Sequence, residues 1–220
     1  MRSNPAFLIV VVLSLILGSC TEDKKQRALP IYGERELDQK SVDGEMVMDT
    51  VYHVVPDFRY MNQDSVWIDQ DKVKGKVYVA DFFFTTCPTI CPKMTSQLKR
   101  LQVLTKDIPE IHFLSFSIDP EKDQPEVLRR YIEEYGVSQD NWDFLTGDEE
   151  ATHELGVKGF LVHADSDEDA PGGFAHSPSL VLVDREGLIR GIYDGTSTED
   201  VDRLNKDIRR LLREEYGADF

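Results

Sequence analysis

The stretch "GKVYVADFFFTTCPTICP", residues 75–92, decides the fold. Its first half is a run of apolar and aromatic residues, typical of a strand that is buried on both faces of a parallel sheet. Its second half carries Cys87 and Cys91, each followed by a proline. Proline disfavours a helical residue before it and suits the first helical position, so we expect a tight loop and then a helix that opens at Pro92 with Cys91 at its cap.

The segments after this stretch continue the alternation of helix and strand. The pattern predicts a helix over 92–106, a strand over 111–119, a helix over 125–135, short elements between 144 and 155, a hairpin over 179–195 and a last helix over 198–216. Two short strands with a turn near residues 62–64 precede them. This order is that of an α/β, thioredoxin-like fold with an N-terminal β-strand extension. It places the cysteines at the C-terminal edge of the sheet, where α/β proteins usually carry their chemistry.

Charge excludes one class of partner. The 220 residues contain 41 acidic and 25 basic side chains, which gives a net charge of −16. Binding to nucleic acid requires clustered lysine and arginine, so we expect no nucleic-acid partner. The acidity is interpreted as a well-solvated surface, and the alternative is a surface that attracts cations or basic partners.

The N-terminus is a separate segment. Residues 6–17, "AFLIVVVLSLIL", form an apolar run that is shorter than the roughly 20 residues of a membrane-spanning helix. The run ends in "LGSC", and small residues before a cysteine resemble a bacterial lipoprotein signal. We therefore expect a signal peptide over 1–19 and a lipid on Cys20. A plain signal peptide or an uncleaved anchor is the alternative, and either places the body outside the cytoplasm.

Residues 20–45 are polar and predict a tether, followed by a folded domain over 46–220. With Cys20 assigned to the lipid, Cys87 and Cys91 are the two remaining cysteines. Disulfides persist outside the cytoplasm, so this pair can cycle between dithiol and disulfide.

The spacing of the pair also suits a metal. Three residues separate the cysteines, one more than in a thioredoxin-type redox pair, which lets the sulfurs spread around an ion. Two thiolates suit Cu(I) and are too few for a closed structural zinc site. We expect the positive end of the following helix to stabilise a Cys91 thiolate. A third ligand is needed.

Five histidines could supply that ligand. His53 and His112 lie in strand patterns and are interpreted as packing residues, His153 lies on a short polar helix, and His163 lies beside an acidic loop. His176 directly precedes a core strand. In the thioredoxin arrangement the segment that enters this strand passes over the cysteines, so His176 is the candidate by topology, and a surface-loop histidine is the alternative.

Three segments together carry a family resemblance. "FFFTTCPTICPKMT" (82–95), "SFSIDPEKDQPEVL" (115–128) and "AHSPSLVLVDREG" (175–187) resemble the SCO/SenC family, and the similarity extends over about residues 52–216. The resemblance implies a membrane-held domain that binds copper, as Cu(I) or Cu(II), through Cys87, Cys91 and His176. It also implies a role in assembling the binuclear copper centre of cytochrome c oxidase, by delivering copper, by reducing the target cysteines, or both.

Two further residues, Asp119 and Pro178, are expected near the site. Asp119 matches a family segment and is interpreted either as a turn residue or as a support for the copper ligands. Pro178 enters the strand as a cis-proline does in thioredoxins, so we expect a cis Ser177–Pro178 bond, although only about 5% of such bonds are cis. A cis bond would favour contact with the extended chain of a partner.

Competing functions remain open at this point. A thiol-disulfide oxidoreductase without obligatory copper would use the same cysteines, so the sequence leaves open whether the chain is an enzyme. A peroxidase is disfavoured because the residues before Cys87 lack the expected proline. The acidic loop 164–173 is interpreted as a solvated excursion, because it lacks the glycine and glutamate of a calcium loop.

Overall fold

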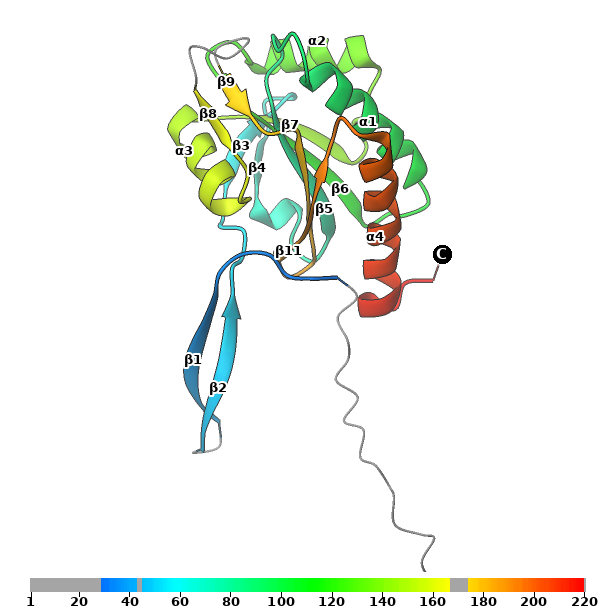
Figure 1. Cartoon of the computed structure of the whole chain (residues 1–220). Coiled ribbons are helices and arrows are strands. Elements are labelled where there is room, and N and C mark those ends of the chain that lie inside the picture. Colours follow the sequence, from blue (N-terminus) through cyan, green and yellow to red (C-terminus); the bar gives the residue numbers. More distant parts are fainter. Residues whose placement is uncertain (1–28, 43–44, 167–173, 220) are drawn as a thin grey trace, which may run out of the picture.

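The computed structural model describes residues 29–42, 45–166 and 174–219. A seven-stranded mixed sheet of order β11-β10-β5-β6-β7-β3-β4 forms its centre (Figure 1). Its strands are β3 (Arg59–Asn62), β4 (Trp67–Asp69), β5 (Val77–Phe83), β6 (Ile111–Ser117), β7 (Trp142–Thr146), β10 (Ser179–Val183) and β11 (Ile189–Asp194). The helices are α1 (Cys91–Leu104), α2 (Pro125–Tyr135), α3 (Glu149–Glu154) and α4 (Thr198–Tyr216), with a 3₁₀ turn at Gln70–Lys72 and a π-helical turn at Leu155–Gly159. The predicted signal peptide and Cys20 lie outside the described residues.

Strand β5 is an interior strand of the sheet, between β10 and β6. All seven of its residues are buried, and it pairs in parallel with β6 and antiparallel with β10. Its aromatic residues pack on both faces of the sheet. Phe82 stacks on Phe116 at 5.4 Å between ring centroids, whereas Phe83 packs on Tyr131 and Phe144 on the opposite face. Burial on both faces explains why the strand reads as a continuous apolar run.

Three helices share one face of this sheet. Helix α1 contacts α2 through the Thr95 and Tyr131 hydroxyls, 2.7 Å apart, and contacts α4 through an Arg100–Asp202 ion pair of 2.7 Å. Helix α3 lies on the other side (Figure 1). The predicted α/β order is therefore confirmed, and it brings the start of α1 to the C-terminal edge of β5.

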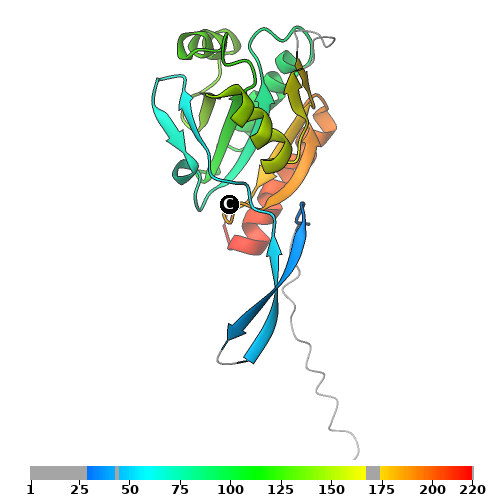
Figure 2. The ribbon, with the colours of Figure 1, turned by 90° about the vertical axis from the view of Figure 1, so that its left-hand side faces the viewer.

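The N-terminal extension is larger than predicted. The expected hairpin is present as β3 and β4, which pair antiparallel and join the main sheet at β7. A second hairpin, β1 (Arg35–Val42) with β2 (Glu45–Tyr52), forms its own two-stranded sheet and projects from the body (Figure 2). We call it the N-terminal arm.

The predicted start of the folded part, residue 46, is too late. Leu29 and Ile31 are buried in the body, and the Arg190 guanidinium donates to the Leu29 carbonyl at 2.8 Å. Residues 35–42 have no apolar periodicity of their own but are ordered as a strand by pairing with β2. Their polarity suggested a tether because cross-strand pairing cannot be recognised from one strand alone.

Two further hairpin strands lie near the cysteine edge. They are β8 (Ala164–Ser166) and β9 (Phe174–His176), paired antiparallel with Ala164 opposite His176. The remaining acidic residues of the predicted solvated loop, 167–173, lie outside the described residues. Among the helices that the structure describes, none is both long and apolar enough to cross a membrane.

Candidate copper site

The cysteine loop joins the end of β5 to the start of α1. A turn closes it at the near end, where the Cys87 amide donates to the Phe84 carbonyl at 3.2 Å. Helix α1 begins at Cys91, one residue before the predicted Pro92, and Ile90 caps it without a side-chain hydrogen bond. Pro92 has no amide hydrogen, and the Lys93 and Met94 amides donate to the Ile90 carbonyl at 3.0 Å, so the Cys91 amide is the one that serves the preceding loop.

Both thiols are buried and reduced. Cys87 is 7% exposed and Cys91 is 1% exposed, and no disulfide joins them. The Cys91 amide donates to the Cys87 sulfur at 3.5 Å. The positive end of α1 thus acts on Cys87, and we expect Cys87 to carry the negative charge of the pair.

The prediction of a Cys91 thiolate is wrong. A side-chain hydrogen bond to Cys87, followed by burial, raises the pKa of the Cys91 thiol well above its usual range. Helix position alone favoured Cys91. The structure shows that the sulfur of Cys87, four residues before the start of α1, accepts from the Cys91 amide, and the raised pKa of Cys91 favours its protonated form.

A buried carboxyl lies on β5, the strand that leads into the cysteine loop. Asp81 of β5 accepts a hydrogen bond of 2.5 Å from the Ser115 hydroxyl, which in turn accepts from the Trp142 indole at 2.9 Å. Burial raises the pKa of Asp81 to about 7, and its charge also raises the pKa of Cys91. An ionised Asp81 therefore opposes a second thiolate at this site.

A second buried carboxyl holds the loop from the side. Asp123 accepts from the Thr85 amide at 3.0 Å, from the Ser117 hydroxyl at 2.6 Å and from the Thr85 hydroxyl. Burial raises the pKa of Asp123, and these hydrogen bonds oppose the rise. The contacts connect the cysteine loop to the turn between β6 and α2.

Asp119 lies in the same turn. Its carboxylate pairs with Lys122 at 2.7 Å, and its carbonyl accepts from the Asp123 amide at 2.9 Å. These contacts are those of a turn residue, one of its two predicted roles. The other, support for copper ligands, stays a prediction.

The strand register brings the His176 backbone toward the cysteine loop. In the β10–β5 pair, Val181 lies opposite Ala80. Continued by the same register, Ser177 lies level with Phe84, where the cysteine loop begins. The β8–β9 hairpin and the start of α1 lie at the same end of the body in both views (Figures 1 and 2). The position of the His176 side chain lies outside what the structure describes.

The prediction of a cis Ser177–Pro178 bond is wrong. Among the described residues no peptide bond is cis. The entering segment is fixed instead by the Ser177 amide, which donates to the His163 carbonyl at 2.9 Å, and by the Pro178 carbonyl, which accepts from the Gly195 amide at 2.6 Å. The support that a cis bond would have given to partner contact is therefore removed.

The other histidines are placed as predicted. His53 contacts the Gly159 carbonyl at 2.8 Å and His112 contacts Asp143 at 2.8 Å, so both act in packing. His153 lies on α3. Among the side chains that the structure describes, no group of three or more His, Cys, Asp or Glu is arranged to hold a metal. The role of His176 as a third ligand stays a prediction.

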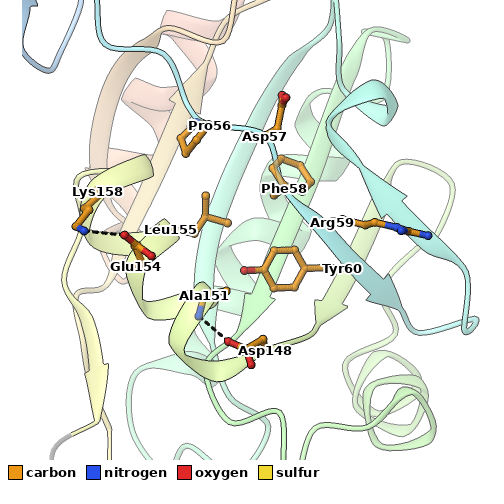
Figure 3. Close-up of a pocket in the computed structure, with 10 residues that line it drawn as sticks. All are labelled: Pro56, Asp57, Phe58, Arg59, Tyr60, Asp148, Ala151, Glu154, Leu155 and Lys158. Carbon is orange, nitrogen blue, oxygen red and sulfur yellow. Dashed lines mark hydrogen bonds and ion pairs between the residues drawn. The ribbon is translucent and has the colours of Figure 1, made fainter.

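A separate cavity of about 520 Å³ lies between α3 and the segment before β3 (Figure 3). Phe58, Tyr60 and Leu155 contribute its apolar lining. The polar side chains at its rim already have partners in or next to α3. Asp148 caps this helix, and Glu154 pairs with Lys158 at 2.6 Å. None of the predicted site residues lines this cavity.

Comparison with known proteins resolves the family. The family model described as SCO1/SenC matches residues 47–213. The chain belongs to this family. The "SCO1 protein homolog" of Bacillus subtilis (strain 168) is 35% identical over 170 residues, which cover 76% of this chain and 86% of that protein.

Two solved structures extend the comparison to the fold. A SCO1/SenC family lipoprotein from Bacillus anthracis str. Ames is 34% identical with a TM-score of 0.67, covering 72% of this chain and 95% of that one. BsSco, described with a disulfide switch and as a member of the Sco family of cytochrome c oxidase assembly proteins, is 34% identical with a TM-score of 0.65, covering 72% and 93%. Both confirm the thioredoxin-like SCO fold.

Sequence reasoning missed two carboxylates of this SCO1/SenC domain. Asp81 had a usable signal, since it is the one charged residue in the apolar run 77–84. Asp123 had none, because it lies in the charged segment "DPEKDQPE" and cannot be told there from its exposed neighbours. Its burial becomes evident only when the turn between β6 and α2 is placed against the cysteine loop.

Proposed function

We propose that this chain is a membrane-tethered copper chaperone that helps to assemble the binuclear copper centre of cytochrome c oxidase. The observation that carries the proposal is the cysteine pair itself. Two buried, hydrogen-bonded thiols lie at the C-terminal edge of the sheet, Cys87 in the loop and Cys91 at the start of α1 of the SCO1/SenC fold. Thiolates are soft ligands that select Cu(I) over harder ions.

The proposed ligands are Cys87, Cys91 and His176. Copper is the cargo, and it displaces the proton that Cys91 carries in the reduced form, because a thiol must ionise to ligate a metal. His176 supplies the third donor. Its backbone position in β9, ahead of a strand that pairs with β5, supports this role. A third ligand would complete the coordination that two sulfurs leave open.

The proposed partner is the copper-bearing subunit of cytochrome c oxidase. BsSco is described as belonging to a family of oxidase assembly proteins, and this chain has its fold and is 34% identical to it over the 72% of this chain that aligns. Delivery of copper and reduction of the subunit's cysteines both use the same pair. The net charge of −16 disfavours nucleic acid as a partner.

The second candidate is a thiol-disulfide oxidoreductase that needs no copper. The hydrogen bond between the two thiols favours it, because it brings together the two groups that would form the disulfide. The Cys87 thiolate would attack a target disulfide, and Cys91 would then lose its proton and attack Cys87. The target gains two electrons and its two thiols, and this chain is left with the Cys87–Cys91 disulfide.

The proposed location is the outer side of a membrane, with lipid on Cys20. The support is the sequence "LGSC" after an apolar run, together with the likeness to a Bacillus anthracis lipoprotein. The described chain begins at Leu29, so the stretch between the proposed anchor and the folded body is short.

The experiment replaces one histidine at a time in the reduced protein. His176→Ala is expected to weaken Cu(I) binding at least tenfold in competition with a chelator, because one of three donors is lost. His163→Ala is the matched control, since His163 is an exposed histidine whose backbone carbonyl fixes the same entering segment. Unchanged copper affinity in His176→Ala would contradict the three-ligand site. Formation of the Cys87–Cys91 disulfide is expected in both variants.

A further inference from the structure

Asp123 is a buried carboxylate whose three hydrogen-bond partners are all donors. It is 0% exposed and lies in the turn between β6 and α2. Its Oδ2 accepts from the Thr85 amide at 3.0 Å and from the Ser117 hydroxyl at 2.6 Å, and its Oδ1 accepts from the Thr85 hydroxyl. Hydrogen bonds to a charged acceptor are roughly twice as strong as neutral ones.

These contacts support the segment that carries Cys87, the cysteine of the pair that lies outside any helix or strand. Cys91 is the first residue of α1 and is fixed by the helix. Cys87 lies in the loop between β5 and α1, where the turn to Phe84 orders its backbone. Thr85 lies inside that turn, two residues before Cys87. Asp123 holds Thr85 by both its backbone and its side chain.

The turn that carries Asp123 is itself well anchored. The Asp123 amide donates to the Asp119 carbonyl at 2.9 Å, and the Asp119 amide donates to the Ser117 hydroxyl at 3.2 Å. Ser117 ends β6, which pairs in parallel with β5 up to Phe83. The carboxylate thus connects the loop to the strand next to it.

We propose that Asp123 is a positioning residue that fixes the Cys87 sulfur next to the Cys91 amide and thiol. The proposal rests on the proposed function in one respect, that the cysteine pair is the working group. A carboxylate suits the task because it offers acceptors on both oxygens and no competing donor. An asparagine at this position would turn an NH₂ group toward one of the three donors.

The consequence is a set distance between the two sulfurs. We call the hydrogen bonds between Asp123 and Thr85 the clamp. When the clamp is loosened, the effective concentration of the Cys87 thiol at the Cys91 thiol falls. Oxidation of the pair, from two thiols to one disulfide with release of two protons and two electrons, becomes less favourable. A tenfold fall in effective concentration raises the reduction potential of the disulfide by about 30 mV.

The test compares three variants of the full chain without metal. Asp123→Asn is expected to raise the Cys87–Cys91 reduction potential by about 30 mV in glutathione redox buffers, for that tenfold change. It is also expected to increase the alkylation rate of Cys87 at least threefold. Thr85→Val removes the hydroxyl contact but keeps the amide contact, so a smaller shift in the same direction is expected.

The matched control is Asp143→Asn. Asp143 is also buried and accepts from Asn62 at 2.9 Å and His112 at 2.8 Å, but it lies on β7, two strands from β5. It is expected to lose thermal stability without a shift in potential or in Cys87 alkylation.

Equal effects of Asp123→Asn and Asp143→Asn on the cysteines, or no effect of Asp123→Asn, would overturn the proposal. If Asp123→Asn does not fold, the presence or absence of a shift in Thr85→Val decides. Neither result depends on copper, because the readouts are the potential and the alkylation rate of the thiols. A chain whose His176→Ala variant binds copper normally can still show the clamp, so the two proposals fail separately.

Discussion

The two cysteines differ in their surroundings, and this difference assigns their chemistry. Cys87 receives the first helix amide, whereas Cys91 is 1% exposed and its pKa is raised by its hydrogen bond to Cys87 and by burial. We therefore propose that Cys87 is the sulfur that attacks or first meets copper, and that Cys91 resolves the exchange or completes the site.

Single-cysteine variants test this assignment. In Cys91→Ser the remaining Cys87 is expected to react with iodoacetamide at pH 8 at least tenfold faster than Cys91 does in Cys87→Ser. The reason is that alkylation needs an accessible thiolate. Mass spectrometry of timed samples measures both rates, and both proteins in denaturant serve as the control for intrinsic reactivity. Equal rates in the folded proteins would refute the assignment.

Asp81 predicts a pH dependence of stability. Burial raises its pKa from 3.8 in the unfolded chain to about 7 in the folded one, so the folded state binds the proton more tightly. The contribution of this group is fully present below about pH 4 and is lost as the pH rises through 7. A shift of this size corresponds to at most about 4 kcal/mol.

Asp81→Asn tests this dependence, because its amide keeps the shape and cannot titrate. Urea unfolding of the variant between pH 4 and 8 is expected to lose most of the fall in unfolding free energy that the parent shows. Ser115→Ala keeps the carboxyl and should retain that fall. A parent whose stability is flat over this range would show that Asp81 does not titrate there.

Among the elements, local patterns could be predicted and cross-chain pairing could not. Strand β5, the cysteine loop and α1 follow each other in sequence, so the apolar run and the two Cys-Pro pairs were sufficient. The N-terminal arm was missed because β1 depends on β2 for its order. The role of Asp123 was missed for a related reason, since it contacts Thr85, which lies 38 positions away.

We predict that the body tolerates deletion of the N-terminal arm. Arg35 and Tyr52 lie opposite each other at its base, so a short Asn-Gly link can replace residues 36–51. Since the arm forms its own sheet and projects from the body, we expect the unfolding free energy to change by less than about 1 kcal/mol. Leu29→Ala, which truncates a buried side chain, is expected to cost about 2–5 kcal/mol. A large loss on deletion would show that the arm packs on the body.

In the whole molecule, the point where the chain enters the body and the cysteine loop lie at opposite ends of β5. The chain enters the body at Leu29, whose carbonyl is held by Arg190 of β11, and Arg190 also pairs with Asp184 at 2.8 Å and Glu215 at 2.5 Å. This cluster lies at the edge of the sheet where β5 starts, whereas the cysteines follow its end.

The site itself could be predicted in part. The position of the cysteine pair was evident from the spacing and the prolines, and the backbone position of His176 followed from topology, because a strand antiparallel to β5 must be entered beside the cysteine loop. The roles of Cys87, Cys91 and His176 as copper ligands stay predictions. Which sulfur is protonated could not be predicted, since it depends on where one amide points. The trans Ser177–Pro178 bond could not be predicted either, because backbone contacts of His163 and Gly195 fix that segment.

X-ray absorption at the copper edge of the Cu(I)-loaded chain tests the central claim most directly. Two sulfur scatterers and one nitrogen scatterer per copper are expected in the parent, and the nitrogen is expected to disappear in His176→Ala but not in His163→Ala. A copper ion with fewer than two sulfur neighbours, or a nitrogen neighbour that survives the loss of His176, would contradict the account.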